Sequence, residues 1–309
     1  MKIECTFEWN DFSFCPTATY VKFFNKIKLL RPDIEFVFND AVAARIQAEK
    51  EKRYFGHSSK FGPFYMVINN VYTNKYILVS YWDSIKDIFE CDCNFSIRMM
   101  RDLITSSGVN IDDYTFNSVP YLNYTPFSYT VNTPQIEEEI DRLVSLNLEK
   151  TVPDKPRFRS FPNDAFRRYL LNDTRFDCLD KRVDQLMQRE YMQELNTHKI
   201  NLSVNGHAEI CHRDIEILGL GNVLLRTTLR GKFHEPLIPG YHYIGVDIDD
   251  FTDHKTITDK LIDKYNEIKN DEPLLNFIGK NAREWYTCNG TSEANAEILT
   301  RLVDFDRLN

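Results

Sequence analysis

Arginines crowd into one stretch of a chain that is otherwise acidic. The formal net charge is −8, yet one short stretch holds Arg157, Arg159, Arg167, Arg168 and Arg175. A guanidinium presents paired N–H donors to phosphate, so converging arginines can neutralise a diphosphate leaving group without a metal ion. Solvated charges on a helix face are the alternative, and they are the common outcome for arginine. The local excess suits a small anion better than a nucleic acid, which usually binds a wider basic field.

A second candidate for anion binding lies where the pattern of a strand gives way to that of a helix. Residues 199–204 form an apolar run of buried-strand length, and residues 208–218 have helical spacing with Gly219 and Gly221 as the expected stop. Strands over residues 222–226 and 241–246 complete a βαβ unit, which predicts a parallel sheet. Ligands bind such sheets at the carboxyl ends of strands, against helix N-termini. The residues predicted to meet a phosphate there are His207, His212 and Arg213.

Three aspartates are candidates for acid–base or metal chemistry. Asp40 closes the predicted strand of residues 34–38 and precedes a predicted helix, so it suits a catalytic carboxylate or a helix N-cap. Asp247 and Asp249 form an Asp-x-Asp motif, which in one large class of sugar-nucleotide enzymes binds Mn²⁺. No zinc-binding histidine pattern, phosphate-binding loop or dinucleotide fingerprint occurs. A metal site is therefore an alternative here and not the main expectation.

The elements that must position these residues predict an α/β fold on both sides of a loop-rich segment. Residues 105–135 are loop-like and proline-containing, which divides the chain into domains of residues 1–130 and 131–309. In the first we expect a helix near residues 18–30, strands at 34–38, 64–68 and 76–80, and a helix running into residues 103–104. In the second, beyond the βαβ unit, helices are expected at 136–148, 164–171, 181–195, 256–269, 274–286 and 292–303.

Composition places the chain among ordinary globular proteins. It has 309 residues, 42% of them hydrophobic and 27% charged, which suggests two domains. The seven cysteines show no Cys-x-x-Cys pair, so we expect them to be reduced. No signal-peptide core and no apolar run long enough to span a membrane is present. These features predict a soluble protein of the cytoplasm, or of the host cytoplasm if it is viral.

The C-terminal half resembles glycosyltransferase family 90, which includes capsule-associated enzymes and protein O-glucosyl- and O-xylosyltransferases. The resemblance covers about residues 157–300. Its motifs are Phe158-Arg159-Ser160 with a downstream Arg167, Cys211-His212-Arg213, Leu237-Ile-Pro-Gly-Tyr-His-Tyr-Ile-Gly-Val246, and Ile278-Gly-Lys-Asn-Ala-Arg-Glu-Trp285. In the N-terminal half, the strand ending at Asp40 looks like the family's strand that ends in its catalytic aspartate. The chain departs from the family at Ser160, which follows Arg159 without a glycine, and at Gly245, where proline is usual.

This resemblance implies a GT-B-like fold, with two Rossmann-like domains facing a cleft and a last helix that can return to the first domain. It implies an inverting glycosyltransferase that moves xylose or glucose from a UDP-sugar to a hydroxyl of an oligosaccharide or glycoprotein, without a metal or other cofactor. Asp40 would be the general base. The donor would be bound by Arg159, Ser160, Arg167, His207, His212 and Arg213. The alternatives are a metal-dependent GT-A-type transferase built on Asp247 and Asp249, and a non-catalytic sugar-nucleotide-binding module.

Overall fold

A computed structural model provides the structure of the chain. It describes residues 2–5, 22, 25–38, 65–70, 75–80, 100–105, 123–126, 134–160, 165–180, 187–204, 210, 212–229 and 235–302.

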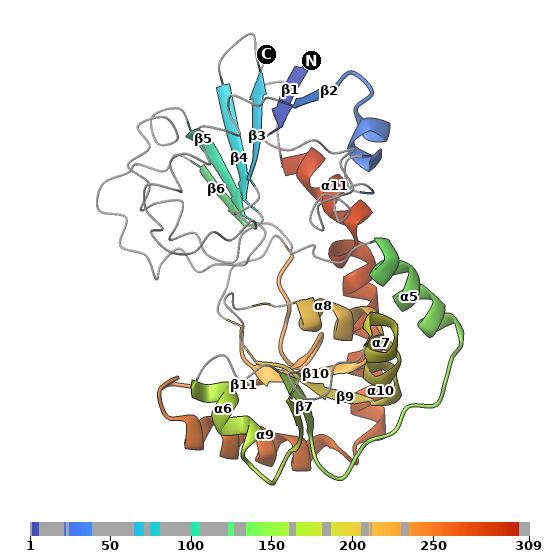
Figure 1. The fold of residues 1–309 in the computed structure, drawn as a ribbon, viewed down its shortest axis with the longest axis vertical. Coiled ribbons are helices and arrows are strands. Elements are labelled where there is room, and N and C mark those ends of the chain that lie inside the picture. The colour runs from blue at the N-terminus through green and yellow to red at the C-terminus, as the bar shows by residue number, and fades with distance from the viewer. Residues whose placement is uncertain are drawn as a thin grey trace.

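A six-stranded sheet occupies the N-terminal half (Figure 1). Its strands, in chain order, are β1 (Lys2–Cys5), β2 (Glu35–Phe38), β3 (Tyr65–Asn70), β4 (Lys75–Ser80), β5 (Met100–Thr105) and β6 (Asn123–Pro126). They lie in the order β2-β1-β3-β4-β5-β6, and β3 is antiparallel to both neighbours while the other pairs are parallel. Strand β2 lies on one side of β1, and β3 to β6 follow on its other side. The strand order therefore reverses at β1, as it does in doubly wound sheets.

The structure differs from the predictions for this half at three strands. Residues 100–105 form β5 between β4 and β6, although a helix was expected to run into residues 103–104. The predicted loop of residues 105–135 contains β6, and residues 2–5, for which no strand was predicted, form β1. Each of these strands is short, and each is paired with a strand distant in the sequence. Tertiary pairing overrides local propensity in such cases.

The C-terminal half contains a parallel sheet that matches the predicted βαβ unit. Its strands are β9 (Ile200–Leu202), β10 (Val223–Thr227) and β11 (Ile244–Val246), in the order β11-β10-β9 and all parallel. Helix α8 (His212–Gly219) connects β9 with β10. Gly221 follows it with φ +67°, the left-handed conformation that ends helices and that glycine adopts most readily. Strands β7 (Arg157–Ser160) and β8 (Asp177–Asp180) form a second, parallel pair.

Two hydrophobic cores sandwich this sheet, because successive side chains of β10 point to opposite faces. Leu224 packs into a core with α5 (Pro134–Ser145), α7 (Gln188–Thr197) and α8. Val223 and Leu225 pack into the opposite core with α6 (Ala165–Leu171) and α9 (His254–Ile268). Helix α10 (Glu272–Trp285) contributes to both cores. The result is a three-layer α/β/α arrangement that fixes α8 against the sheet.

The chain ends with a π-helical turn, η2 (Tyr286–Gly290), and helix α11 (Ser292–Leu302). Figure 1 shows α11 rising from α10 toward the N-terminal half, and the ammonium of Lys26 lies 2.7 Å from a carboxylate oxygen of Glu297 in this helix. Among the described helices, none combines the length and apolar character needed to cross a membrane.

Both halves are α/β, which confirms the predicted fold class. In the described residues, no strand pairing joins the six-stranded sheet to the strands that follow residue 134. Two separate sheets fit the predicted GT-B-like arrangement. The exact division near residue 130 stays a prediction.

Candidate functional site

The N-terminus of α8 lies at the carboxyl edge of the parallel sheet. Strand β9 ends at Leu202, and the buried residues Ser203 and Val204 follow it. The helix begins at His212, so Arg213 is its second residue. The first turn of a helix presents backbone N–H groups that lack partners within the helix, together with the positive end of its dipole. Arg213 lies in this turn of α8. Such an edge can hold an anion.

The side chain of Arg213 lies between the two cores. Its guanidinium carbon is 5.9 Å from the centroid of the Phe158 ring, which belongs to the core containing α6 and α9. It also hydrogen-bonds the hydroxyl of Tyr191, which packs against the other core. The Tyr191 hydroxyl donates a 2.9 Å hydrogen bond to Oε2 of Glu216. Burial, and then the nearby Glu216 carboxylate, hold the pKa of Tyr191 well above its usual value, so this phenol stays protonated.

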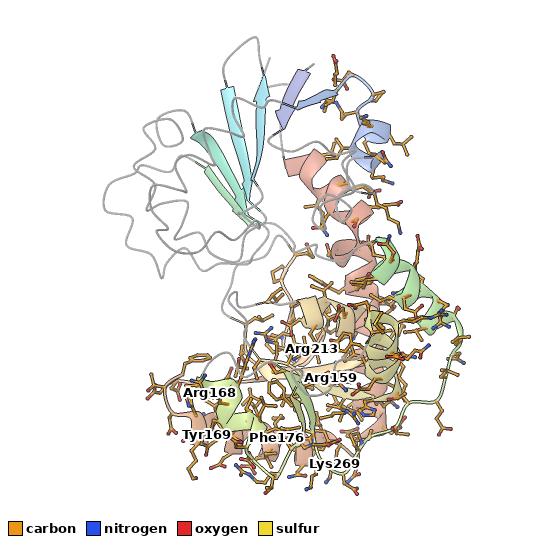
Figure 2. All side chains as sticks on the ribbon, in the orientation of Figure 1. Arg159, Arg168, Tyr169, Phe176, Arg213 and Lys269 are labelled. Carbon is orange, nitrogen blue, oxygen red and sulfur yellow. The ribbon has the colours of Figure 1, made fainter. Side chains whose placement is uncertain are left out.

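Arg159 lies in β7, next to Phe158, and Figure 2 labels it close to Arg213 in the view. Its Nη2 donates a 2.6 Å hydrogen bond to Oε2 of Glu194 in α7. Residues two apart share a face of a strand, and Arg157 accordingly reaches the other carboxylate oxygen of Glu194 at 2.7 Å. Ser160, the last residue of β7, is buried. In this structure Arg159 is therefore held against α7.

The other arginines of the cluster do not all gather at this edge. Arg167 and Arg168 lie in α6, which packs on α9 through Phe166 and His254, with ring centroids 5.3 Å apart. Arg175 is paired with Asp173 and Asp259, in each case at 2.6 Å. The structure thus separates an arginine cluster that is contiguous in the sequence. It brings Arg159 into the neighbourhood of Arg213, and it holds Arg175 elsewhere.

A buried ion pair anchors the first turn of α8 to the sheet. Asp214 in α8 accepts a hydrogen bond from Arg226 in β10, and both side chains are fully buried. Arg226 also donates from Nε to the carbonyl of Thr227 at 3.2 Å. An acidic residue in a first helical turn complements the dipole. This pair sets the position of Arg213, the residue before Asp214.

The alternative metal motif follows β11. Oδ1 of Asp247 accepts a 2.6 Å hydrogen bond from the hydroxyl of Thr228, and the backbone carbonyl of Asp247 accepts one of 3.0 Å from Lys260. Asp249 is fully exposed, and its carboxylate lies 4.0 Å from the Lys260 ammonium. A cation beside both aspartates opposes a metal ion there. In the described part of the chain, histidines, cysteines and carboxylates form no group of three or more that could hold a metal ion.

Several predicted site residues fall outside the described residues. They are Asp40, the next carboxylates after it in the sequence (Asp83 and Asp87), and His207. His212 is described only as the first residue of α8. By sequence, Asp40 follows the last residue of β2 by two positions. Its role as a base or as a cap stays a prediction.

Sequence reasoning missed Tyr191, Glu194 and Glu216, which surround the arginines in the structure. Tyr191 and Glu194 are three residues apart in a helix that was expected, so they share a face. That spacing is too common to identify a site. What makes the three residues notable is their contact with Arg213 and Arg159, which depends on the tertiary packing of α7 against α8 and β7.

No protein-family model and no curated protein matches the chain. It is similar to solved structures of HepE from Anabaena in complex with UDP (10% identity, 97% of this chain and 98% of that chain, TM-score 0.48). It is also similar to sucrose-phosphate synthase from Thermosynechococcus elongatus (12% identity, 88% and 73%, TM-score 0.48). A third similar structure is a glycosyltransferase from Rickettsia africae (12% identity, 98% and 84%, TM-score 0.45). At TM-scores below 0.5 these likenesses establish neither a family nor a substrate, and membership of family 90 stays a prediction.

Proposed function

We propose that the chain is an inverting glycosyltransferase that moves xylose or glucose from a UDP-sugar to a hydroxyl of a glycan or protein. The observation that carries this proposal is the place of Arg213. It is the second residue of a helix that follows the carboxyl end of a strand in a parallel sheet. A diphosphate bound there would meet backbone N–H groups and a guanidinium together.

The chemistry asks for stabilisation of a diphosphate leaving group. As the bond between the anomeric carbon and the diphosphate breaks, negative charge grows on the departing oxygen. Arg213 and the first turn of α8 would bind that charge, and no metal ion would be required. Arg159, whose guanidinium is held by Glu194, would add to the positive field at the same edge without being the main contact.

The base is proposed to be Asp40, acting from the N-terminal half. It would take the proton of the acceptor hydroxyl as the new glycosidic bond forms on the opposite side of the anomeric carbon, which inverts that centre. The structural alternative is that Asp40 only caps the helix predicted to follow it. Asp40→Asn separates the two, because asparagine caps a helix well but cannot act as a base.

The experiment that tests the function is a screen for UDP release over a panel of UDP-sugars, preceded by a thermal-shift measurement with UDP. Stabilisation by UDP and release from UDP-xylose or UDP-glucose are expected. In Asp40→Asn, melting and UDP affinity should stay near those of the wild type while turnover falls about a hundredfold or more. Binding without any release, whatever acceptor is offered, would favour a non-catalytic binding module. The absence of any UDP effect would overturn the proposal.

A further inference from the structure

Tyr191 connects the arginine at the start of α8 with a carboxylate one turn further along the same helix. Arg213 and Glu216 are three residues apart in α8 and so lie on one face of it. The Tyr191 hydroxyl hydrogen-bonds both of them, from the neighbouring helix α7. Glu216 is only 5% exposed, so its carboxylate is an acceptor fixed in place.

We propose that Tyr191, anchored by Glu216, positions Arg213 to bind the diphosphate of the donor. This inference rests on the proposed function. It assigns a role to Tyr191 and Glu216, which the proposed reaction does not use. Neither is a catalytic residue, since both would act through Arg213.

The physical case is that an arginine side chain has many rotamers and loses that freedom when it binds. A hydroxyl that accepts from the guanidinium and donates to a buried carboxylate fixes one orientation before the ligand arrives. The Phe158 ring, whose centroid lies 5.9 Å from the guanidinium carbon, limits the movement of the Arg213 side chain on the side of the core that contains α6 and α9. Burial raises the pKa of Tyr191 well above its usual value, so the phenol keeps the proton that it donates to Glu216.

The test is the affinity for UDP of Tyr191→Phe, measured by calorimetry. The matched control is Tyr265→Phe, which removes the hydroxyl of another tyrosine of the same half, a buried one bonded to the carbonyl of Pro153. Loss of a positioning hydrogen bond should weaken UDP binding about three- to tenfold, and the control should bind like the wild type. Glu216→Gln keeps an oxygen acceptor for the hydroxyl and should stay within about twofold of the wild type.

A double-mutant cycle separates positioning from general damage to the fold. If Tyr191 acts through Arg213, the Tyr191→Phe change should have little further effect on UDP affinity in the Arg213→Ala background. If the effects of Tyr191→Phe and Arg213→Ala on UDP affinity multiply in the double variant, the inference is wrong. It is also wrong if Tyr191→Phe binds UDP like the Tyr265→Phe control. Failure of the wild type itself to bind UDP would instead refute the proposed function, so the two failures are distinguishable.

Discussion

The two ends of helix α8 both carry cations, but in opposite relation to the helix dipole. At the C-terminal end, Arg283 donates to the carbonyl of Gly219 at 2.7 Å, and Lys150 donates to the carbonyl of Leu220 at 2.6 Å. Cations are stabilising there, since the carbonyl groups form the negative end. At the N-terminal end Arg213 meets the positive end, where a cation is unfavourable by a few tenths of a kcal/mol to about 1 kcal/mol.

The proposed function assigns ligand binding to the N-terminal end of α8 and leaves a structural role to its C-terminal end. The cations at the C-terminal end complete hydrogen bonds of the fold, and Arg283 is further paired with Asp141 at 2.7 Å. Arg213 breaks a local rule of helix stability, and such exceptions gather at functional sites. An anionic ligand would reverse the sign of the interaction, because it would be attracted by the arginine and by the dipole at once.

The largest effect is expected from the anchor of the N-terminal end. Arg226→Met leaves Asp214 buried without its cation, and loss of one partner of a buried pair costs about 3–5 kcal/mol. Urea unfolding should show this loss in the free energy of unfolding. The double variant Arg226→Met/Asp214→Leu removes both charges and should recover most of it. If the single variant loses less than about 1 kcal/mol, the pair does not anchor α8.

The next effect contrasts the arginines at the two ends. Arg213→Ala should weaken UDP binding roughly ten- to a hundredfold, because charge-assisted hydrogen bonds contribute about 1.5–3 kcal/mol. Arg283→Ala should lower the melting temperature and leave UDP affinity unchanged. Calorimetry and thermal melting measure both quantities.

Arg189→Ala is the control for the loss of an arginine, since that side chain is 67% exposed. An Arg213→Ala variant that binds UDP normally would contradict the assignment, and so would an Arg283→Ala variant that loses UDP.

The contrast also shows what the sequence could reveal about this region. The βαβ unit was predictable because its apolar runs are short, its periodicity changes from strand to helix, and Gly219 and Gly221 mark the helix end. The start of the helix was less well predicted, because the pattern placed it at residue 208 and α8 begins at His212. The place of Arg213 as the second helical residue therefore comes from the structure. The role of Lys150 at the other end was not predictable, because it depends on contacts with residues about 70 positions later.

Contacts between residues distant in the sequence also explain where the predictions differ from the structure. The arginine cluster is contiguous in the sequence, but the structure pairs Arg157 and Arg159 with Glu194 and pairs Arg175 with Asp259. Charge alone could not reveal the contacts of Arg159 with Glu194 and of Arg175 with Asp259, because these partners lie 35 and 84 residues away. Strand β5 was missed for a related reason, since its place is set by β4 and β6 and not by its own residues.

A smaller effect is expected from the titration of Lys150. Burial, and then the positive charges of Lys199 and Arg283, lower the pKa of Lys150 from 10.5 to about 8. The folded state therefore binds fewer protons than the unfolded chain between about pH 8 and pH 10.5, so this group makes stability rise with pH across that window. The cost of burying the charged form is present below the window.

Lys150→Met removes this titration. Urea unfolding at several pH values should therefore show the wild type gaining stability relative to Lys150→Met as the pH rises through the window. If the difference in the free energy of unfolding between the two proteins stays constant with pH, the Lys150 ammonium keeps an ordinary pKa. UDP affinity should not change in the variant, since Lys150 serves the structural end of α8.

The smallest expected effect is that of removing divalent metal ions. If the arginine and the N-terminus of α8 bind the diphosphate, EDTA should leave UDP release unchanged, and Mn²⁺ should not increase it. The acidic motif after β11 gives a physical reason: Asp247 accepts a hydrogen bond from Thr228, and the ammonium of Lys260 lies 4.0 Å from the carboxylate of Asp249. Asp247→Asn/Asp249→Asn should therefore turn over like the wild type, with or without EDTA. Activity that collapses with EDTA, returns with Mn²⁺ and is lost in this double variant would move the diphosphate to the aspartates. In that case both ends of α8 would be structural, and the contrast between them would no longer indicate the site.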